Sequence, residues 1–273
     1  MKRILGKAVV WSAALLVLAV GARAQVNVEI TAFGGYNLNL GFPQTITLSS
    51  QLATESSGWY TEWQNFINHP MLEQAGGAAF GGRLAVQITP MIGIEASFEY
   101  GAVQFRYNVA DIAALQNKME AVGWGPYFTF VTSGGHMMRI YGNVVLNFPV
   151  PGGFTPYITG GIGTTSFTLY PSGPSVSMSR SAWDSSDDWH YVDTSALTFN
   201  AGGGFKYLFG PMVGIRVDAR VFLGSPKFDQ YVASKEFGDW YIGPGTGSAQ
   251  PGGSTQSGSH TDVVLNAGIF IRL

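Results

Sequence analysis

The sequence predicts an all-β fold, an eight-stranded antiparallel up-and-down transmembrane β-barrel with four long extracellular loops. Three observations lead to this prediction. Apolar and polar residues alternate with period two in eight segments, as in strands with one apolar and one polar face. The connections between these segments alternate between long and short, an asymmetry typical of outer-membrane barrels. Only 12% of the residues are charged, whereas 14% are aromatic and 37 of 273 are glycine, which is little charge for a soluble domain.

The first 24 residues predict export. A basic start precedes an apolar run over residues 8–20 and a small-residue A-x-A motif at residues 22–24, the three parts of a secretory signal peptide. The apolar run is shorter than the roughly 20 residues that a membrane-spanning helix needs. We therefore expect a signal peptide over residues 1–24 and an outer-membrane β-barrel domain over residues 25–273.

Charge and cysteine content exclude further classes of protein. Without residues 1–24 the chain keeps 11 of its 15 Lys and Arg against 17 Asp and Glu, a formal charge of −6. A nucleic-acid partner is not expected, because such proteins carry a basic patch. The chain has no cysteine, so it cannot be stabilised by the disulfides common in secreted domains.

The first three strands are predicted on either side of a long connection. Residues 28–38 alternate between an apolar and a polar face, and about forty residues follow, with a short helix predicted near residues 61–67. Residues 80–102 then read as a hairpin turning at Thr89-Pro90-Met91, where proline does not interrupt a ladder of hydrogen bonds.

Five more segments repeat the alternation. The predicted strands are 138–148, 154–167, 197–207, 213–221 and 262–273. The faces of the segment 154–167 are less certain, because it is rich in Gly and Thr. Two short turns and three further long connections join the segments, and residues 110–121 of one long connection have the period of an amphipathic helix. The long connections cover residues 104–136, 168–195 and 224–260, and the short turns cover 149–153 and 209–212.

Alternation alone permits two kinds of barrel. Apolar faces turned outward predict a membrane barrel, whereas apolar faces turned inward predict a soluble, lipocalin-like barrel. The alternation of loop length favours the membrane barrel, because a soluble meander has no reason for it. The polar faces then point inward and predict a lumen charge network: Arg83, Glu95, Glu99, Arg139, Lys206, Arg216, Asp218, Arg220 and Arg272.

The lumen of such a barrel is just wide enough for side chains to fill. With Glu29 and Asp262, the inward set contains five acids and six bases. Because buried charges must be paired, we interpret the network as a plug of salt bridges. A gated, ion-conducting lumen is the alternative, and a wide general porin would need about twice as many strands.

Five strand-turn segments resemble the small eight-stranded outer-membrane β-barrels related to the OmpA transmembrane domain and to OmpW. They are EITAFGGYN, RLAVQITPMIGIEASFEYG, GNVVLNFPVPGGFTPYITGGIG, FNAGGGFKYLFGPMVGIRVDAR and VVLNAGIFIRL. The resemblance covers residues 25–273. It implies a barrel surrounded by outer-membrane lipid and lipopolysaccharide, with both termini in the periplasm. It also implies barrel-assembly machinery and periplasmic chaperones as partners.

The last strand resembles the assembly signal of such barrels, polar-x-Gly-x-x-hydrophobic-x-hydrophobic. Asn266, Gly268, Ile271 and Leu273 occupy its four defined positions. The chain departs from the pattern by ending on Leu, where Phe is commonest.

The long connections hold most of the other candidate functional residues. Partly exposed aromatic side chains are typical interface anchors, so an extracellular ligand or surface is a possible partner. The alternative is that they pack the loops together or lie among lipid headgroups. These aromatic residues are Trp59, Trp63, Phe66, Trp124, Trp183, Trp189 and Trp240.

No pattern in the chain predicts catalysis. Four histidines (His69, His136, His190 and His260) lie in loops or at strand ends near Ser133, Ser186 and Ser257, but with no catalytic spacing. We expect no enzyme and no cofactor, with a lipid-modifying enzyme as the remote alternative. The role is predicted to be structural or surface-interacting, and the main alternative is a narrow channel or a route for small hydrophobic ligands.

One acidic segment is a weak candidate for calcium binding. Asp184, Asp187, Asp188 and Asp193 supply the oxygen ligands that Ca²⁺ prefers. They lack the spacing of an EF-hand, so a solvated polar loop is the simpler interpretation.

Overall fold

The computed structural model describes most of the chain as strands. The described residues are 27–43, 45–48, 72–107, 113, 117, 128–131, 133–169, 175–180, 185–191, 193–234, 240–242 and 254–273. The predicted signal peptide and the helix expected near residues 61–67 lie outside them. Of the helix expected over residues 110–121, only Ala113 and Asn117 are described, and both are helical. No helix among the described residues combines the length and hydropathy needed to cross a membrane.

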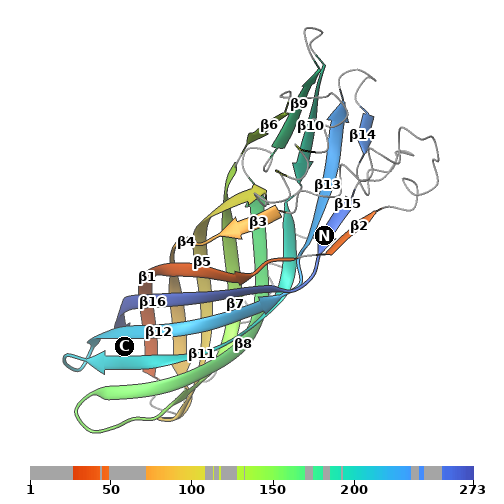
Figure 1. Ribbon diagram of the computed structural model, residues 1–273. Coiled ribbons are helices and arrows are strands. Elements are labelled where there is room, and N and C mark those ends of the chain that lie inside the picture. Colours follow the sequence, from red (N-terminus) through yellow and green to blue (C-terminus); the bar gives the residue numbers. More distant parts are fainter. Residues whose placement is uncertain are drawn as a thin grey trace.

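Eight antiparallel strands form a closed barrel (Figure 1). Each pairs with its neighbours along the chain, and pairing of the first with the last closes the ring. All eight predicted segments lie on these strands, so the predicted strand number and up-and-down order are confirmed. The strands are β1 (Asn27–Gly41), β4 (Gly77–Gln87), β5 (Ile92–Tyr107), β7 (Ser133–Asn147), β8 (Phe154–Leu169), β11 (Thr194–Leu208), β12 (Val213–Gly224) and β16 (His260–Arg272).

The predicted sidedness of the barrel is also confirmed. Ile140 and Phe80 on the apolar faces are 58% and 57% exposed, whereas Arg139 and Glu99 on the polar faces are each 1% exposed. The apolar residues thus form the outer surface and the charges fill the inside. This is the arrangement expected of a barrel in lipid, and the reverse of a lipocalin-like barrel.

The short turns have the chemistry that tight connections need. The hydroxyl of Thr89 accepts hydrogen bonds from the backbone N–H groups of Met91 and Ile92, at 3.2 and 2.9 Å. Gly152 and Gly153 have φ angles of 90° and 83°, which most other residues adopt only with strain. These local features end one strand and start the next without a long loop.

The long connections contain strands that were not predicted from the sequence. Six of them form a ladder with the order β2-β15-β13-β10-β9-β6, and β14 pairs with β13. Figure 1 shows this second sheet beyond one end of the barrel, where several of its strands continue the direction of barrel strands. It consists of β2 (Thr45–Leu48), β6 (Phe128–Val131), β9 (Ser175–Arg180), β10 (Ser185–Tyr191), β13 (Lys227–Ser234), β14 (Trp240–Ile242) and β15 (Ser254–Ser257).

The interpretation of these connections as loops was therefore incomplete. Segments such as SSDDWHY in β10 and STQS in β15 have no apolar face, so hydrophobic alternation does not reveal them. They pair because the barrel strands next to them are already aligned. A further short strand, β3 (Leu72–Ala75), lies beside β5.

Inward-facing glycines make room for the large charged side chains. A Cβ atom added at Gly204 of β11 would lie 2.7 Å from the Cβ of Asp218, and one at Gly202 would lie 2.8 Å from the Cγ of Arg220. Side chains from the facing strand occupy the space that the missing Cβ atoms leave.

Candidate functional site

The charged side chains of the lumen form three clusters along the barrel. The basal cluster lies near the short turns and joins Glu29 of β1 to Lys206 of β11 and Arg272 of β16. Lys206 Nζ is 2.5 Å from Glu29 Oε2, and Arg272 Nη2 is 2.7 Å from Glu29 Oε1. Arg272 is partly exposed, whereas the other two are buried.

The central cluster joins β4 and β5 to β12 on the opposite side of the ring. Arg83 donates from both terminal nitrogens to Asp218, at 2.5 and 3.1 Å. Glu95 accepts from Arg216 at 2.5 Å and from Arg220 at 2.8 Å. Arg220 also donates to Asp218 at 3.0 Å. Five charges from three strands thus form one connected network across the lumen.

The upper cluster lies nearer the long connections. In it, two carboxylates accept hydrogen bonds from one guanidinium group. Arg139 of β7 donates to Glu99 of β5 at 2.7 Å and also to Asp262 of β16. His260 lies next to it, with Nε2 at 3.3 Å from Asp262 Oδ2 and 3.0 Å from Gln74 Oε1. The three clusters together contain all nine residues of the predicted network.

Aromatic rings inside the barrel pack against four of the guanidinium groups, and three of these contacts are closer than 4.5 Å. The Cζ atom of Arg83 lies 4.0 Å from the ring centroid of Phe33, and that of Arg139 lies 4.2 Å from Phe222. Arg216 lies 4.4 Å from the ring of Tyr157, whose hydroxyl accepts a hydrogen bond from its Nε at 2.7 Å. Such stacking contributes about 2 kcal/mol where the cation is desolvated, and it holds the guanidinium planes in place.

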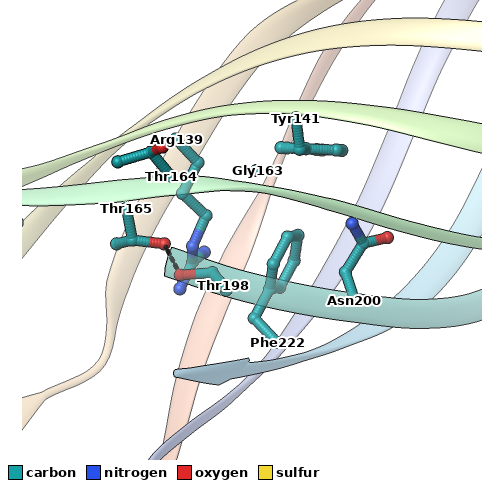
Figure 2. Close-up of a pocket in the computed structure, with 8 residues that line it drawn as sticks. All are labelled: Arg139, Tyr141, Gly163, Thr164, Thr165, Thr198, Asn200 and Phe222. Atoms are coloured by element: carbon teal, nitrogen blue, oxygen red, sulfur yellow. Dashed lines mark hydrogen bonds between the residues drawn. The ribbon is translucent and has the colours of Figure 1, made fainter. Parts of the chain in front are cut away.

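A narrow cavity with polar and aromatic side chains around it lies beside the upper cluster, against the wall formed by β7, β8, β11 and β12 (Figure 2). It is too small to admit a water molecule, whereas drug-sized ligand sites begin at roughly 300 Å³. The hydroxyl of Thr198 donates to that of Thr165 at 2.8 Å on one side. The side-chain amide of Asn200 and the Tyr141 hydroxyl have no hydrogen-bond partner among the described residues. The cavity is lined by Arg139, Tyr141, Gly163, Thr164, Thr165, Thr198, Asn200 and Phe222.

Above this cavity an aromatic layer crosses the lumen. We define it as Phe42, Phe105, Phe167 and Phe228 together with the ring of His260; the four phenylalanines are at most 6% exposed. The centroids of Phe42 and Phe228 are 5.0 Å apart, and those of Phe167 and Phe228 are 5.4 Å apart. Phe167 meets His260 edge to face at 5.1 Å.

The aromatic layer was not predicted from the sequence, although part of its signal was present. Phe105 continues the inward alternation of Glu95 and Glu99 on β5, and Phe228 continues that of Asp218 and Arg220 beyond β12. Phe42 could not have been found in this way, because the register of β1 with β16 shifts between Asn39 and Gly41. That irregularity changes the face to which the next residues point.

The predicted assembly positions lie on β16, between β1 and β12. Asn266 points into the lumen, whereas Ile271 and Leu273 are exposed on the outside. The backbone N–H of Leu273 donates to the carbonyl of Val28 at 2.9 Å. A Cβ atom added at Gly268 would lie 2.8 Å from the Cβ of Phe33. The last residues of the chain therefore complete the wall of the barrel.

Five of the seven predicted loop aromatics lie outside the described residues: Trp59, Trp63, Phe66, Trp124 and Trp183. Trp189 and Trp240 lie in β10 and β14, which flank β13 and place them opposite Val232 and Ser234. These two belong to the second sheet rather than to irregular loops.

Three of the four aspartates of the acidic segment lie in the described part of the chain. Asp184 lies outside the described part of the chain, Asp187 and Asp188 lie in β10, and Asp193 lies between β10 and β11. The described residues contain no group of three His, Cys, Asp or Glu able to hold a metal ion. The ring of His136, on β7, stacks on that of Tyr100 with the centroids 5.1 Å apart. His260 lies on another strand, β16, and inside the lumen.

Comparison with known proteins agrees with this architecture. A family model for the outer membrane protein β-barrel domain matches residues 12–234. OprG from Pseudomonas aeruginosa is similar in structure, with a TM-score of 0.52 and 12% identity over 90% of this chain and 95% of OprG. At that identity the likeness shows the fold alone.

Two further solved structures are less similar. AlkL in DMPC lipid bilayers has a TM-score of 0.43 and 10% identity, over 91% of this chain and 89% of AlkL. A major outer membrane protein of Thermus thermophilus has a TM-score of 0.41 and 12% identity, over 90% of this chain and 99% of that one. A search of curated proteins found no match.

Proposed function

Since the chain belongs to the outer membrane protein β-barrel domain family, we propose that it is a non-enzymatic barrel, closed by salt bridges, with a structural or surface-interacting role. It is located in the outer membrane, surrounded by lipid and lipopolysaccharide. The long connections carry that role, and the lumen is not a route for solutes.

The observation that carries the proposal is the pairing of the lumen charges. Each of the nine predicted network residues has an oppositely charged partner within 3 Å. Removing one partner of a buried pair costs about 3–5 kcal/mol. Ions would have to separate such pairs in order to pass, so the clusters favour a closed barrel.

The second sheet supports a role at the end that carries the long connections. Strands β2, β6, β9, β10, β13, β14 and β15 extend the molecule beyond the barrel. A barrel needs only short loops to close, so this additional ordered structure is not required by the fold. We interpret it as the part that meets other molecules at the cell surface.

The surroundings of His136 and His260, the two histidines whose side chains are described, favour a non-enzymatic role. His260 contacts Gln74, Asp262 and aromatic rings inside the lumen, and His136 stacks on Tyr100. Hydrolytic catalysis by serine needs a histidine within hydrogen-bond reach of the hydroxyl. These contacts give the two histidines other roles.

Export and assembly complete the proposal. Residues 1–24 act as the signal peptide, and Asn266, Gly268, Ile271 and Leu273 are read by the barrel-assembly machinery after delivery by periplasmic chaperones. Both termini then lie in the periplasm, and the long connections lie outside the cell.

Planar-bilayer recording tests whether the lumen is closed. The purified full chain should insert and remain electrically silent at neutral pH, with insertion verified by heat-modifiable migration on a detergent gel. Regular single-channel steps from the inserted protein would overturn the plug. They would favour the alternative of a narrow channel.

A further inference from the structure

The aromatic layer is built from widely separated parts of the barrel wall. Phe42 follows β1, Phe105 belongs to β5, Phe167 to β8, Phe228 to β13 and His260 to β16. Because β8 lies across the ring from β1, and β4 separates β5 from β1, the side chains must reach inward to touch. Phe105 contacts Phe42, Phe167 and Phe228, at centroid distances of 6.2, 6.5 and 6.3 Å.

The layer separates two different environments along the lumen. On β8, Phe167 is followed on the inward face, toward the short turns, by Thr165, which lines the polar cavity. On β16, His260 is followed in the same direction by Asp262 of the upper cluster. Apolar rings thus lie directly above a polar cavity and above the charges.

We propose that the aromatic layer is the outer seal of the lumen, which keeps ions and polar solutes on the long-connection side away from the cavity and the charge clusters. The inference rests on the proposed closed lumen and names the layer that closes its outer end. A constriction lined by apolar side chains excludes ions by dewetting, without any charge of its own. The ion pairs below are then a second, separate barrier.

His260 is the polar member of the layer. Its ring meets Phe42 and Phe167 edge to face, with interplanar angles of 85° and 87°. Its Nε2 atom faces Gln74 of β3 and Asp262. The histidine therefore connects the phenylalanines to the polar groups beneath them, and it keeps the seal in register with the upper cluster.

Cysteine accessibility can test the seal, because the chain contains no cysteine. Thr198 lines the cavity and is 5% exposed, so Thr198→Cys places one thiol beneath the layer. A charged methanethiosulfonate reagent is added from outside to cells that carry this variant in the outer membrane. The thiol should react slowly. In the background Phe105→Ala with Phe228→Ala, the rate should rise about tenfold or more, equivalent to 1.4 kcal/mol off the barrier.

A matched control separates the seal from general loosening of the barrel. Phe199 is the next residue after Thr198, but it is exposed on the outside. Phe199→Ala should leave the reaction rate of Thr198→Cys unchanged. If the double variant fails to insert, the single change Phe42→Ala, which removes one ring of the layer, provides the test, with a smaller rise. Heat-modifiability verifies that each variant is folded.

Two results would overturn the proposal. One is a thiol at position 198 that reacts as fast with the layer intact as with it truncated. The other is a folded, truncated variant whose thiol stays unreactive. Conductance of the unaltered protein would instead contradict the salt-bridge plug, so the two failures are distinguishable.

Discussion

The lumen is filled in two different ways along its length. In the central cluster, five charged groups occupy defined positions, and each depends on a particular partner across the barrel. In the aromatic layer, four phenylalanines and a histidine fill the same cross-section by contact between rings. Directional pairing of charges holds the first region together, whereas non-directional packing of rings holds the second.

The two regions should respond differently to the loss of one side chain. Removing a charge leaves its partners charged and buried, whereas removing a ring leaves a cavity that neighbours can partly fill. The following three substitutions use this difference, from the largest expected effect to the smallest.

Glu95→Ala should be the most damaging change. It leaves Arg216 and Arg220 without the carboxylate that both of them contact, and an unpaired buried charge costs about 3–5 kcal/mol. Urea unfolding of the refolded barrel in lipid vesicles should show that the free energy of unfolding falls by an amount at the upper end of this range. Raising the salt concentration should change this loss little, because buried pairs are poorly screened. A loss below about 1 kcal/mol would mean that the central cluster is solvated.

Phe228→Ala should destabilise the barrel by about 3 kcal/mol, because truncating a buried Phe removes packing and leaves a cavity. The same urea titration applies, with the exposed Phe199→Ala as the control for loss of a ring that faces outward. Phe199→Ala should lower the free energy of unfolding clearly less than Phe228→Ala does. Equal losses in the two variants would show that Phe228 is no better packed than a residue on the outside.

Arg272→Ala should have the smallest effect, at most about 1 kcal/mol. Its side chain is 27% exposed, and Glu29 keeps Lys206 as a partner at 2.5 Å. The free energy of unfolding of Arg272→Ala should differ little from that of the unaltered protein at low salt, and the difference should be smaller still at high salt. If Arg272→Ala lowered the free energy of unfolding as much as Glu95→Ala does, the basal cluster would be as buried as the central one.

Much of the charged lumen could be predicted from local sequence. Arg83, Glu95 and Arg216 each lie on the polar face of an alternating segment, and the structure places all three inside. The partners could not be predicted. Glu95 contacts Arg216 and Arg220 over more than 120 positions of sequence, and only the closing of the barrel brings β5 and β12 face to face.

The parts that escaped prediction share a physical cause. Strands β10 and β15 have no apolar face because they are not required to contact lipid, so the pattern that marks the barrel strands is missing from them. Phe42 escaped because an irregularity after Asn39 breaks the alternation of β1. Both features depend on pairing with neighbouring strands, which local periodicity does not record.

By itself, the sequence determined the class of fold, the number and order of the barrel strands, and, outside the Gly- and Thr-rich segment 154–167, which face of a strand points outward. It could do so because lipid imposes an alternation of apolar and polar residues, and because the alternation of long and short connections distinguishes a membrane barrel from a soluble one. Only the tertiary structure decided which acid meets which base, how the second sheet forms, and that four phenylalanines and a histidine pack together near one end of the lumen. Those outcomes depend on contacts across the barrel, and such contacts exist only after the first and last strands have paired.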